Sequence, residues 1–239
     1  TNFMHGIPHF AISIALEREG RLVSGLIYNP VTDELFLAER GQGAFSHNTR
    51  LRVGGRSRML DAVFACGAPH GERAGRNEFI TEMETLLPKV AGIRRFGAAA
   101  LDLAYVAAGR VDGFWERGLA PWDMAAGIVI CREAGGLVSD TKNGSKFFET
   151  GEVVAANEAL HGDLLLINLD GEDSKYSCEL HHGLHSWVGA ATDGGYLGSD
   201  ARAFVSAVLS GAAGYYALAL AGDAGVRTDL IIRPEQDVH

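Results

Sequence analysis

One acidic residue stands at the start of an otherwise apolar helix predicted between Gly118 and Gly136. Pro121 suits the first turn of a helix because its missing N–H has no partner there, and Gly135 is typical of a helix end. Asp123 therefore falls in the first turn, where unpaired N–H groups and the helix dipole favour a negative charge. Two interpretations remain open at this point. Asp123 stabilises the helix start, or the helix keeps this carboxylate ionised so that it can hold a cation.

A second group of metal-ligating residue types lies further along the chain. Cys178, His181 and His185 stand at positions i, i+3 and i+7, so a helix would place them on one face. Side chains of these types at this spacing can hold Zn²⁺ with an open or external fourth ligand. The alternative interpretation is that the histidines are solvated side chains of a polar segment.

Composition and charge exclude some classes of protein. The chain has 239 residues, of which 47% are hydrophobic and 21% charged, as in a globular protein of one or two domains. The net charge of −9 argues against nucleic acid as a partner, because affinity for phosphates comes from clustered Lys and Arg. Four arginines between Arg50 and Arg58 predict an exposed hairpin or, alternatively, a polyanion site. The three widely spaced cysteines favour a reducing, cytoplasmic setting without disulfides.

The elements that must position Asp123 fall into two parts. Residues 9–53 predict an antiparallel meander, because apolar residues alternate in HFAISIALE and RLVSGLIYNP and turn residues separate the strands. From about residue 61, short apolar strands alternate with helical patterns, which indicates a layered α/β domain. The character of the sheet is therefore expected to change near residue 60. The helical faces are predicted from the spacing of Phe79, Ile80, Met83, Leu86 and Leu87 in one helix, and of Leu101, Ala104, Tyr105 and Ala108 in the next.

The two ends of the sequence are less regular. Beyond Asn168 the chain becomes polar and glycine-rich, and residues 203–222 then carry no charge over a full helical length. This stretch predicts a membrane contact, a buried or partner-packing helix, or a tail without an evolved fold. The chain opens on Thr1 rather than Met and shows no signal peptide, so we expect a cut or incomplete gene product.

Three stretches together carry a resemblance to a known family. They are TNFMHGIPHFAISIALE, RRFGAAALDLAYVAAGRVDGFWE and the WD…EAGG pattern that begins at Trp122. From Thr1 to about Leu165 the chain resembles the bacterial inositol monophosphatase family of magnesium-dependent sugar-phosphate phosphatases. The resemblance implies a layered α-β-α-β-α sandwich lacking its N-terminal helices and first strands. Residues 1–60 are then the remnant of an antiparallel-sheet layer, 61–168 an α/β layer, and 169–239 an unassigned tail.

The resemblance also implies roles for individual residues. Asp123 matches the catalytic acid that binds Mg²⁺ and contacts the substrate, an inositol or other sugar phosphate. Glu116 matches the acid that accepts hydrogen bonds from ring hydroxyls, and Trp122 is expected to orient Asp123 or simply to pack in the core. Neither His5 nor His9 receives a role. The turn that lies against the substrate matches Gly97, Ala98 and Ala99.

Other residues that the family needs are not in this sequence. The resemblance implies an Asp-Pro-x-Asp-Gly-Thr run just before Thr1 and a Glu-Glu pair further upstream, which supply most of the metal ligands. One carboxylate with water cannot fix Mg²⁺ tightly, because this ion gives up its hydration reluctantly. We therefore expect a polypeptide of these residues alone to be inactive, and the family further implies a homodimer.

Two alternative functions remain open. The first is a related phosphatase, acting on fructose 1,6-bisphosphate, histidinol phosphate or a 3′-phosphoadenosine nucleotide, since relatives of one fold differ in substrate. The second is a non-catalytic binding or regulatory chain that keeps the scaffold without the metal half, and a broken reading frame would explain the same features.

Overall fold

The structure is a computed structural model that describes residues 1–69 and 75–169. No helix within these two ranges is long and apolar enough to cross a membrane. The possible zinc ligands Cys178, His181 and His185 and the uncharged stretch 203–222 lie outside the described residues.

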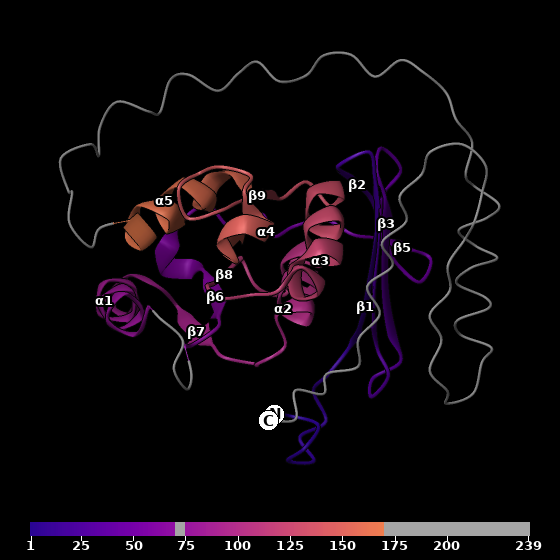
Figure 1. The fold of residues 1–239 in the computed structure, drawn as a ribbon. Helices are drawn as coiled ribbons and strands as arrows, with labels where there is room; N and C mark the ends of the chain where they lie inside the picture. Colours follow the sequence, from indigo (N-terminus) through magenta and orange to yellow (C-terminus); the bar gives the residue numbers. More distant parts are fainter. Residues whose placement is uncertain (70–74, 170–239) are drawn as a thin grey trace. The chain divides into compact units, whose positions relative to one another are not determined.

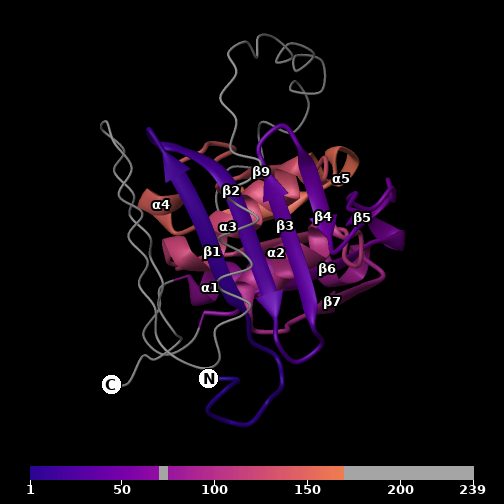
Figure 2. The ribbon, with the colours of Figure 1, turned by 90° about the vertical axis from the view of Figure 1, so that its right-hand side faces the viewer.

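The first part of the chain forms an antiparallel sheet, as predicted. Each strand pairs with the next along the chain, in the order β1-β2-β3-β4-β5. Figure 2 shows the long strands side by side, with α2 and α3 behind them. The strands are β1 (Ile12–Arg18), β2 (Arg21–Asn29), β3 (Glu34–Glu39), β4 (Gly43–Ser46) and β5 (Thr49–Arg50).

The second part forms a mixed sheet of order β7-β6-β8-β10-β9. Strand β6 runs parallel to both β7 and β8, while β10 runs antiparallel to β8 and β9. Its strands are β6 (Val63–Cys66), β7 (Gly92–Arg94), β8 (Gly113–Glu116), β9 (Leu137–Ser139) and β10 (Val153–Ala156). The helices are α1 (Arg76–Leu86), α2 (Ala99–Ala107), α3 (Pro121–Glu133), α4 (Phe147–Thr150) and α5 (Glu158–Leu169), with 3-10 turns at Met59–Asp61 and Leu87–Lys89.

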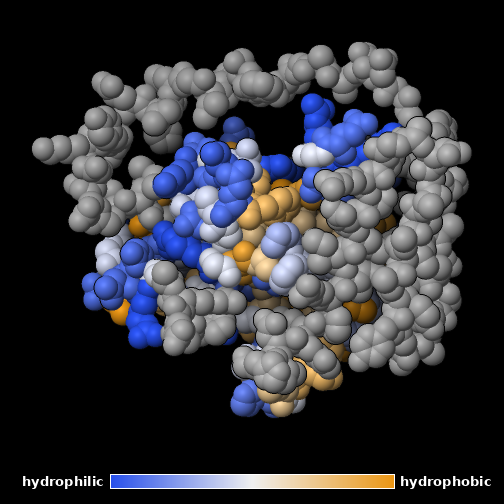
Figure 3. All heavy atoms as spheres, viewed as in Figure 1, coloured by the Kyte–Doolittle hydropathy of each residue, from blue (hydrophilic) through white to orange (hydrophobic). Residues whose placement is uncertain are grey.

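The elements of residues 1–169 stack in layers. Helices α2 and α3 lie between the two sheets, and α1 and α5 cover the other face of the mixed sheet (Figure 1). The order sheet, helices, sheet, helices agrees with the α/β sandwich predicted from the sequence. Hydrophilic residues gather over α1 and α5 on the face shown in Figure 3, and apolar residues come to the surface towards its middle.

Glycines allow α3 to pack closely on both sides. A Cβ atom at Gly25 of β2 would lie 2.5 Å from the carbonyl oxygen of Ala126. A Cβ atom at Gly127 would lie 2.5 Å from the side chain of Leu103 on α2. These contacts seat α3 against both β2 and α2, and so fix the place of its first turn.

Two of the helix faces differ from the prediction. Ile80 and Leu87 are 49% and 55% exposed, because the mixed sheet and α5 cover only one side of α1. Helix α2 is buried on almost every side, since α3 and the two sheets surround it. A one-sided apolar pattern was therefore the wrong expectation for α2.

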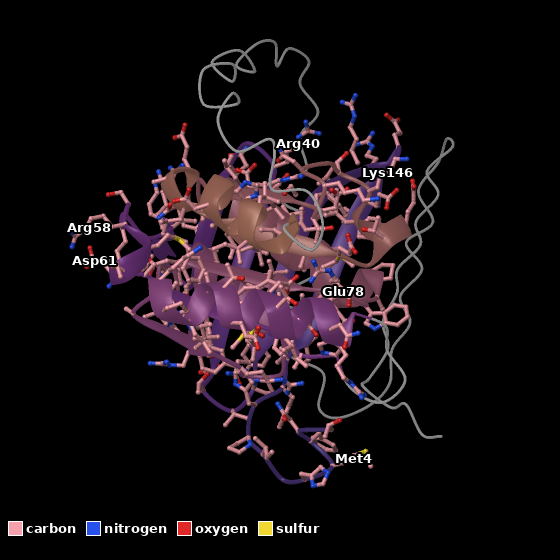
Figure 4. All side chains as sticks on the ribbon, turned by 90° about the vertical axis from the view of Figure 1, so that its left-hand side faces the viewer. Met4, Arg40, Arg58, Asp61, Glu78 and Lys146 are labelled. Carbon is pink, nitrogen blue, oxygen red and sulfur yellow. The ribbon has the colours of Figure 1, made fainter. Side chains whose placement is uncertain are left out.

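The prediction of an exposed hairpin for the four arginines between Arg50 and Arg58 was wrong. Only Arg50 belongs to a strand, and the others follow it in the connection to the mixed sheet. Arg56 Nη1 lies 3.1 Å from Oδ1 of the buried Asp112. Arg58 points towards Asp61 (Figure 4), with 2.6 Å between Nε and Oδ2. Two of the four arginines are thus paired with acids within the chain.

Candidate substrate site

The parallel strands of the mixed sheet bring the predicted site residues to one edge. Strands β6, β7 and β8 run in the same direction, so their carboxyl ends meet at the same edge of the sheet. Glu116 is the last residue of β8, and α2 and α3 begin a few residues after β7 and β8. In open α/β sheets, ligands bind outside the carboxyl ends of such strands. This edge is therefore the candidate site.

Asp123 lies in the first turn of α3, as predicted. Its Oδ2 accepts a hydrogen bond of 2.9 Å from the backbone N–H of Ala120, the residue before the helix. Pro121 opens the helix and Gly135, with a φ of +89°, follows its end. The side chain of Asp123 is half-buried. The structure thus shows Asp123 stabilising the start of α3, which is the first of the two interpretations. This capping bond involves only one of the two carboxylate oxygens.

Glu116 lies against the end of the neighbouring strand. A Cβ atom at Gly67, the residue after β6, would lie 1.8 Å from Cδ of Glu116. The backbone of Gly67 donates a hydrogen bond of 3.1 Å to the carbonyl of Trp115, so this segment follows β8 to its end. The absence of a side chain at Gly67 gives the half-buried Glu116 carboxyl its place at the edge of the sheet.

The turn before α2 is held by the first residues of the chain. Gly97 has a φ of +84°, a conformation that favours glycine. Asn2 Nδ2 donates to the carbonyls of Phe96 and Gly97, at 3.3 Å each, and to that of His9 at 2.9 Å. Ala98 is the N-cap of α2 and has no capping side chain. The N–H groups of this first turn are therefore the donors that the turn offers to a ligand.

A buried acid that the sequence did not single out lies below this turn. Asp102 is 1% exposed, and its backbone N–H donates to the carbonyl of Ala98 at 3.0 Å. Burial, and then the charge of Glu116, raise the pKa of Asp102 to about 8. The sequence did contain a signal for this group, because Asp102 is the one acid in the apolar run AALDLAYVAA. An acid in such a run is unusual, since acids are rarely buried without a partner.

Residue Glu82 of α1 supports the end of β8 from the other side. Trp115 Nε1 donates to Glu82 Oε2 at 2.9 Å, and Arg117 forms an ion pair with the same carboxylate. Arg117 Nε also lies 3.8 Å from Glu152 Oε1. Burial raises the pKa of Glu82, and Arg117 opposes this shift. These contacts hold β8 on both sides of Glu116.

Three further residues were considered in the sequence: Trp122, His9 and His5. Trp122 is half-buried, and its expected packing beside Asp123 stays a prediction. The ring of His9 lies beside Phe96 and Tyr105, with centroids 5.7 and 6.3 Å apart, and burial lowers its pKa. His5 is exposed.

The described residues do not by themselves fit a metal ion. No group of three or more His, Cys, Asp or Glu side chains within residues 1–69 and 75–169 has the arrangement that a metal requires. Asp123 contributes one carboxylate, and one of its oxygens already caps α3. The Mg²⁺ site implied by the resemblance thus needs ligands in addition to these residues.

Comparison with known proteins agrees with this architecture. Residues 1–169 match the sequence model of the inositol monophosphatase family. Over 165 residues the chain is 56% identical to an inositol-1-monophosphatase of Mesorhizobium japonicum, which covers 69% of this chain and 62% of that protein. It is 50% identical over 159 residues to the Nus factor SuhB of Pseudomonas aeruginosa, covering 66% and 59% of the two chains.

Solved structures show the same similarity. The extragenic suppressor protein suhB of Bartonella henselae superimposes with a TM-score of 0.69 at 53% identity, covering 71% of this chain and 66% of that one. An inositol monophosphatase of Anabaena has a TM-score of 0.64 at 37% identity, over 70% of this chain and 69% of its own. The chain spans about three fifths of the length of the first curated relatives it matches.

Proposed function

The chain belongs to the inositol monophosphatase family. From this premise we propose that it forms the substrate-binding part of an enzyme that hydrolyses an inositol phosphate to inositol and phosphate. The observation that carries this proposal is the gathering of Glu116, Asp123 and the first turn of α2 at the carboxyl edge of β6, β7 and β8. Acidic acceptors for hydroxyls beside helix N–H donors for an anion suit a phosphorylated polyol.

Each residue has a distinct part in the proposal. The carboxylate of Glu116 accepts hydrogen bonds from ring hydroxyls, and the backbone N–H groups of Gly97, Ala98 and Ala99 face the substrate. Asp123 contacts the substrate and is the carboxylate that a metal would use, because the start of a helix favours its ionised form. The proposed cofactor is Mg²⁺, a hard cation that takes carboxylate and phosphate oxygens. Since the described residues do not fit the ion alone, no catalytic step is assigned through it.

The assignment is tested by release of phosphate from inositol 1-phosphate in the presence of Mg²⁺. We propose that a polypeptide of these 239 residues alone shows no turnover above a buffer blank, because one carboxylate does not hold the ion. Turnover that Asp123→Asn abolishes would refute this inactivity but support the site. Binding of inositol 1-phosphate that Glu116→Gln weakens, without turnover, is the expected result.

A non-catalytic binding role is the second candidate, and the lack of a metal cluster among the described residues favours it. Several relatives are named Nus factor SuhB, which is a different kind of name from that of an enzyme. A specific partner retained by the purified chain, together with no turnover, would support this role. A substrate panel with histidinol phosphate and fructose 1,6-bisphosphate separates the related phosphatases.

The compartment and the oligomeric state of the chain can be inferred from its cysteines and its family. We propose a cytoplasmic homodimer, the first because Cys66 and Cys131 are buried free thiols and the second by analogy with the family. Sedimentation of the purified chain measures the oligomeric state, and a monomer at micromolar concentration would contradict the dimer.

A further inference from the structure

Asp102 is a buried acid that has no part in the proposed function. It is the only charged side chain in the sequence of α2, and it is 1% exposed. Neither of its carboxyl oxygens has a hydrogen-bond partner among the described residues. A buried carboxyl without a hydrogen-bond partner is costly, and its ionised form costs more than its protonated form.

Its position connects two parts of the candidate site. The backbone hydrogen bond to Ala98 places Asp102 one turn into α2, directly below the Gly97–Ala99 turn. Helix α2 also packs against β8, whose last residue is Glu116. Asp102 therefore lies behind the surface that the substrate is proposed to meet, where it touches no solvent.

The charged groups around Asp102 come from several elements. Glu116 at the end of β8 disfavours its ionised form, and Arg95 after β7 favours it. Asp102 in turn contributes, after burial, to the raised pKa of Cys66 at the end of β6. Among the other elements that pack against α2, β10 brings only Val and Ala, and the charged residues of α3 and β2 are Asp123, Arg132, Glu133 and Arg21. Burial dominates and keeps the pKa of Asp102 at about 8, so its carboxyl is protonated at neutral pH.

We propose that Asp102 is a positioning residue of the substrate site, which acts on the ligand through Glu116. While Asp102 keeps its proton, this end of the mixed sheet presents the Glu116 carboxylate without a second charge behind it. When Asp102 loses its proton, two negative charges repel each other and a phosphate-bearing ligand. This proposal rests on the proposed function for the nature of the ligand but not for the coupling between the two acids.

The coupling is tested without any ligand. The ¹³C resonances of side-chain carboxyls follow each acid through a pH titration of the full chain. We expect the midpoint of Asp102 to lie near 8 and to fall in Glu116→Gln, since that variant removes the neighbouring charge. A midpoint of Asp102 in the ordinary range of aspartate, or one that does not move in Glu116→Gln, overturns the proposal.

The effect on the ligand is tested with inositol 1-phosphate and myo-inositol, without added metal. The second pKa of the phosphate group lies near 6, so the group is almost fully ionised above pH 7 and a change between about pH 7 and 9.5 reports the protein. We expect the affinity for inositol 1-phosphate to fall about ten-fold over this range, and the affinity for uncharged myo-inositol to change less. In Asp102→Asn the affinity for inositol 1-phosphate should be nearly the same at both ends of this pH range, so that their ratio is close to one.

The outcomes separate the proposal from the proposed function. The same ratio in Asp102→Asn and in the natural chain would assign Asp102 a structural role only and overturn the proposal. If neither probe binds at any pH, the proposed function is contradicted, and the ligand-free titration then decides the coupling. Because that titration uses the natural chain and Glu116→Gln, it stands even if Asp102→Asn does not fold.

Discussion

At the scale of single residues, the close approach of Gly67 to Glu116 gives the first prediction. The Cβ atom in Gly67→Ala would lie 1.8 Å from Glu116 Cδ, so the carboxyl must move from its place. Since the far end of a flexible side chain can move, we expect the fold to remain and the affinity for inositol to fall about ten-fold. Gly55→Ala is the matched control, because no heavy atom lies within 4 Å of its added Cβ. Equal affinities in both variants would place the hydroxyl acceptor elsewhere.

The second residue-scale prediction concerns stability and pH. The pKa of Asp102 is about 8 in the folded chain against 3.8 as its ordinary value. Between these values the folded chain keeps a proton that the unfolded chain loses, so the free energy of unfolding falls as pH rises. Asp102→Asn has no such proton, and its free energy of unfolding should therefore gain on that of the natural chain by about 1 kcal/mol per pH unit.

Urea unfolding of the natural chain and of Asp102→Asn at about pH 5, 6 and 7.5 measures this difference. The free energy of unfolding of Asp102→Asn minus that of the natural chain should rise across that range and level off above the pKa of Asp102. A constant gap would mean that Asp102 titrates alike in the folded and unfolded chains.

At the scale of elements, the packing of α3 against α2 gives the third prediction. Alanine normally stabilises a helix relative to glycine by up to about 1 kcal/mol. In Gly127→Ala, however, the new Cβ would lie 2.5 Å from Leu103, so we expect a net loss of about 1–3 kcal/mol. Gly162→Ala in α5 meets no atom within 4 Å and should stabilise the chain. Chemical denaturation measures both, and a stabilised Gly127→Ala would show that the two helices can separate freely.

The hydrogen bonds donated by the side chain of Asn2 give a fourth prediction, also at this scale. Its side-chain amide joins the first residues of the chain to the turn before α2 through the carbonyls of His9, Phe96 and Gly97. Asn2→Ala leaves these acceptors to water and should cost about 1–2 kcal/mol. Amide hydrogen exchange should then quicken at the Gly97 turn and stay unchanged in β10. Unchanged exchange at the turn would show that the Gly97 conformation does not depend on Asn2.

The elements also show how far the sequence could predict the structure. Local signals sufficed for the meander and for α3, because Pro121, Asp123 and Gly135 act within a few residues of their own positions. The burial of α2 depends on α3 and both sheets, and no periodicity within AALDLAYVA reports such neighbours. The contact between Gly67 and Glu116 joins distant parts of the chain, so it could not be predicted from spacing. Apart from Asp123, which the pattern of the helix start also singled out, the site residues came from the family resemblance, and all of their roles remain predictions.

At the scale of the whole described molecule, the mixed sheet belongs to two hydrophobic cores. Ala65 and Phe114 face the core that α2 and α3 share with the first sheet. Their neighbours Phe64 and Trp115 face the core under α1 and α5. Successive residues of a strand point to opposite faces, so each strand of this sheet connects the two cores through its own backbone. We therefore expect the two cores to lose their packing together.

This shared sheet predicts a single cooperative unfolding transition, and the buried cysteines can report it. Cys131 lies in the first of these cores and Cys66 in the second, and both thiols are buried and free. If the cores unfold together, both thiols should become accessible to an alkylating reagent at the same urea concentration. Mass spectrometry of the labelled peptides distinguishes them from Cys178. Labelling of Cys66 at a clearly lower urea concentration than Cys131 would show that the layer of α1 and α5 separates first, and the mixed sheet would then not couple the two cores.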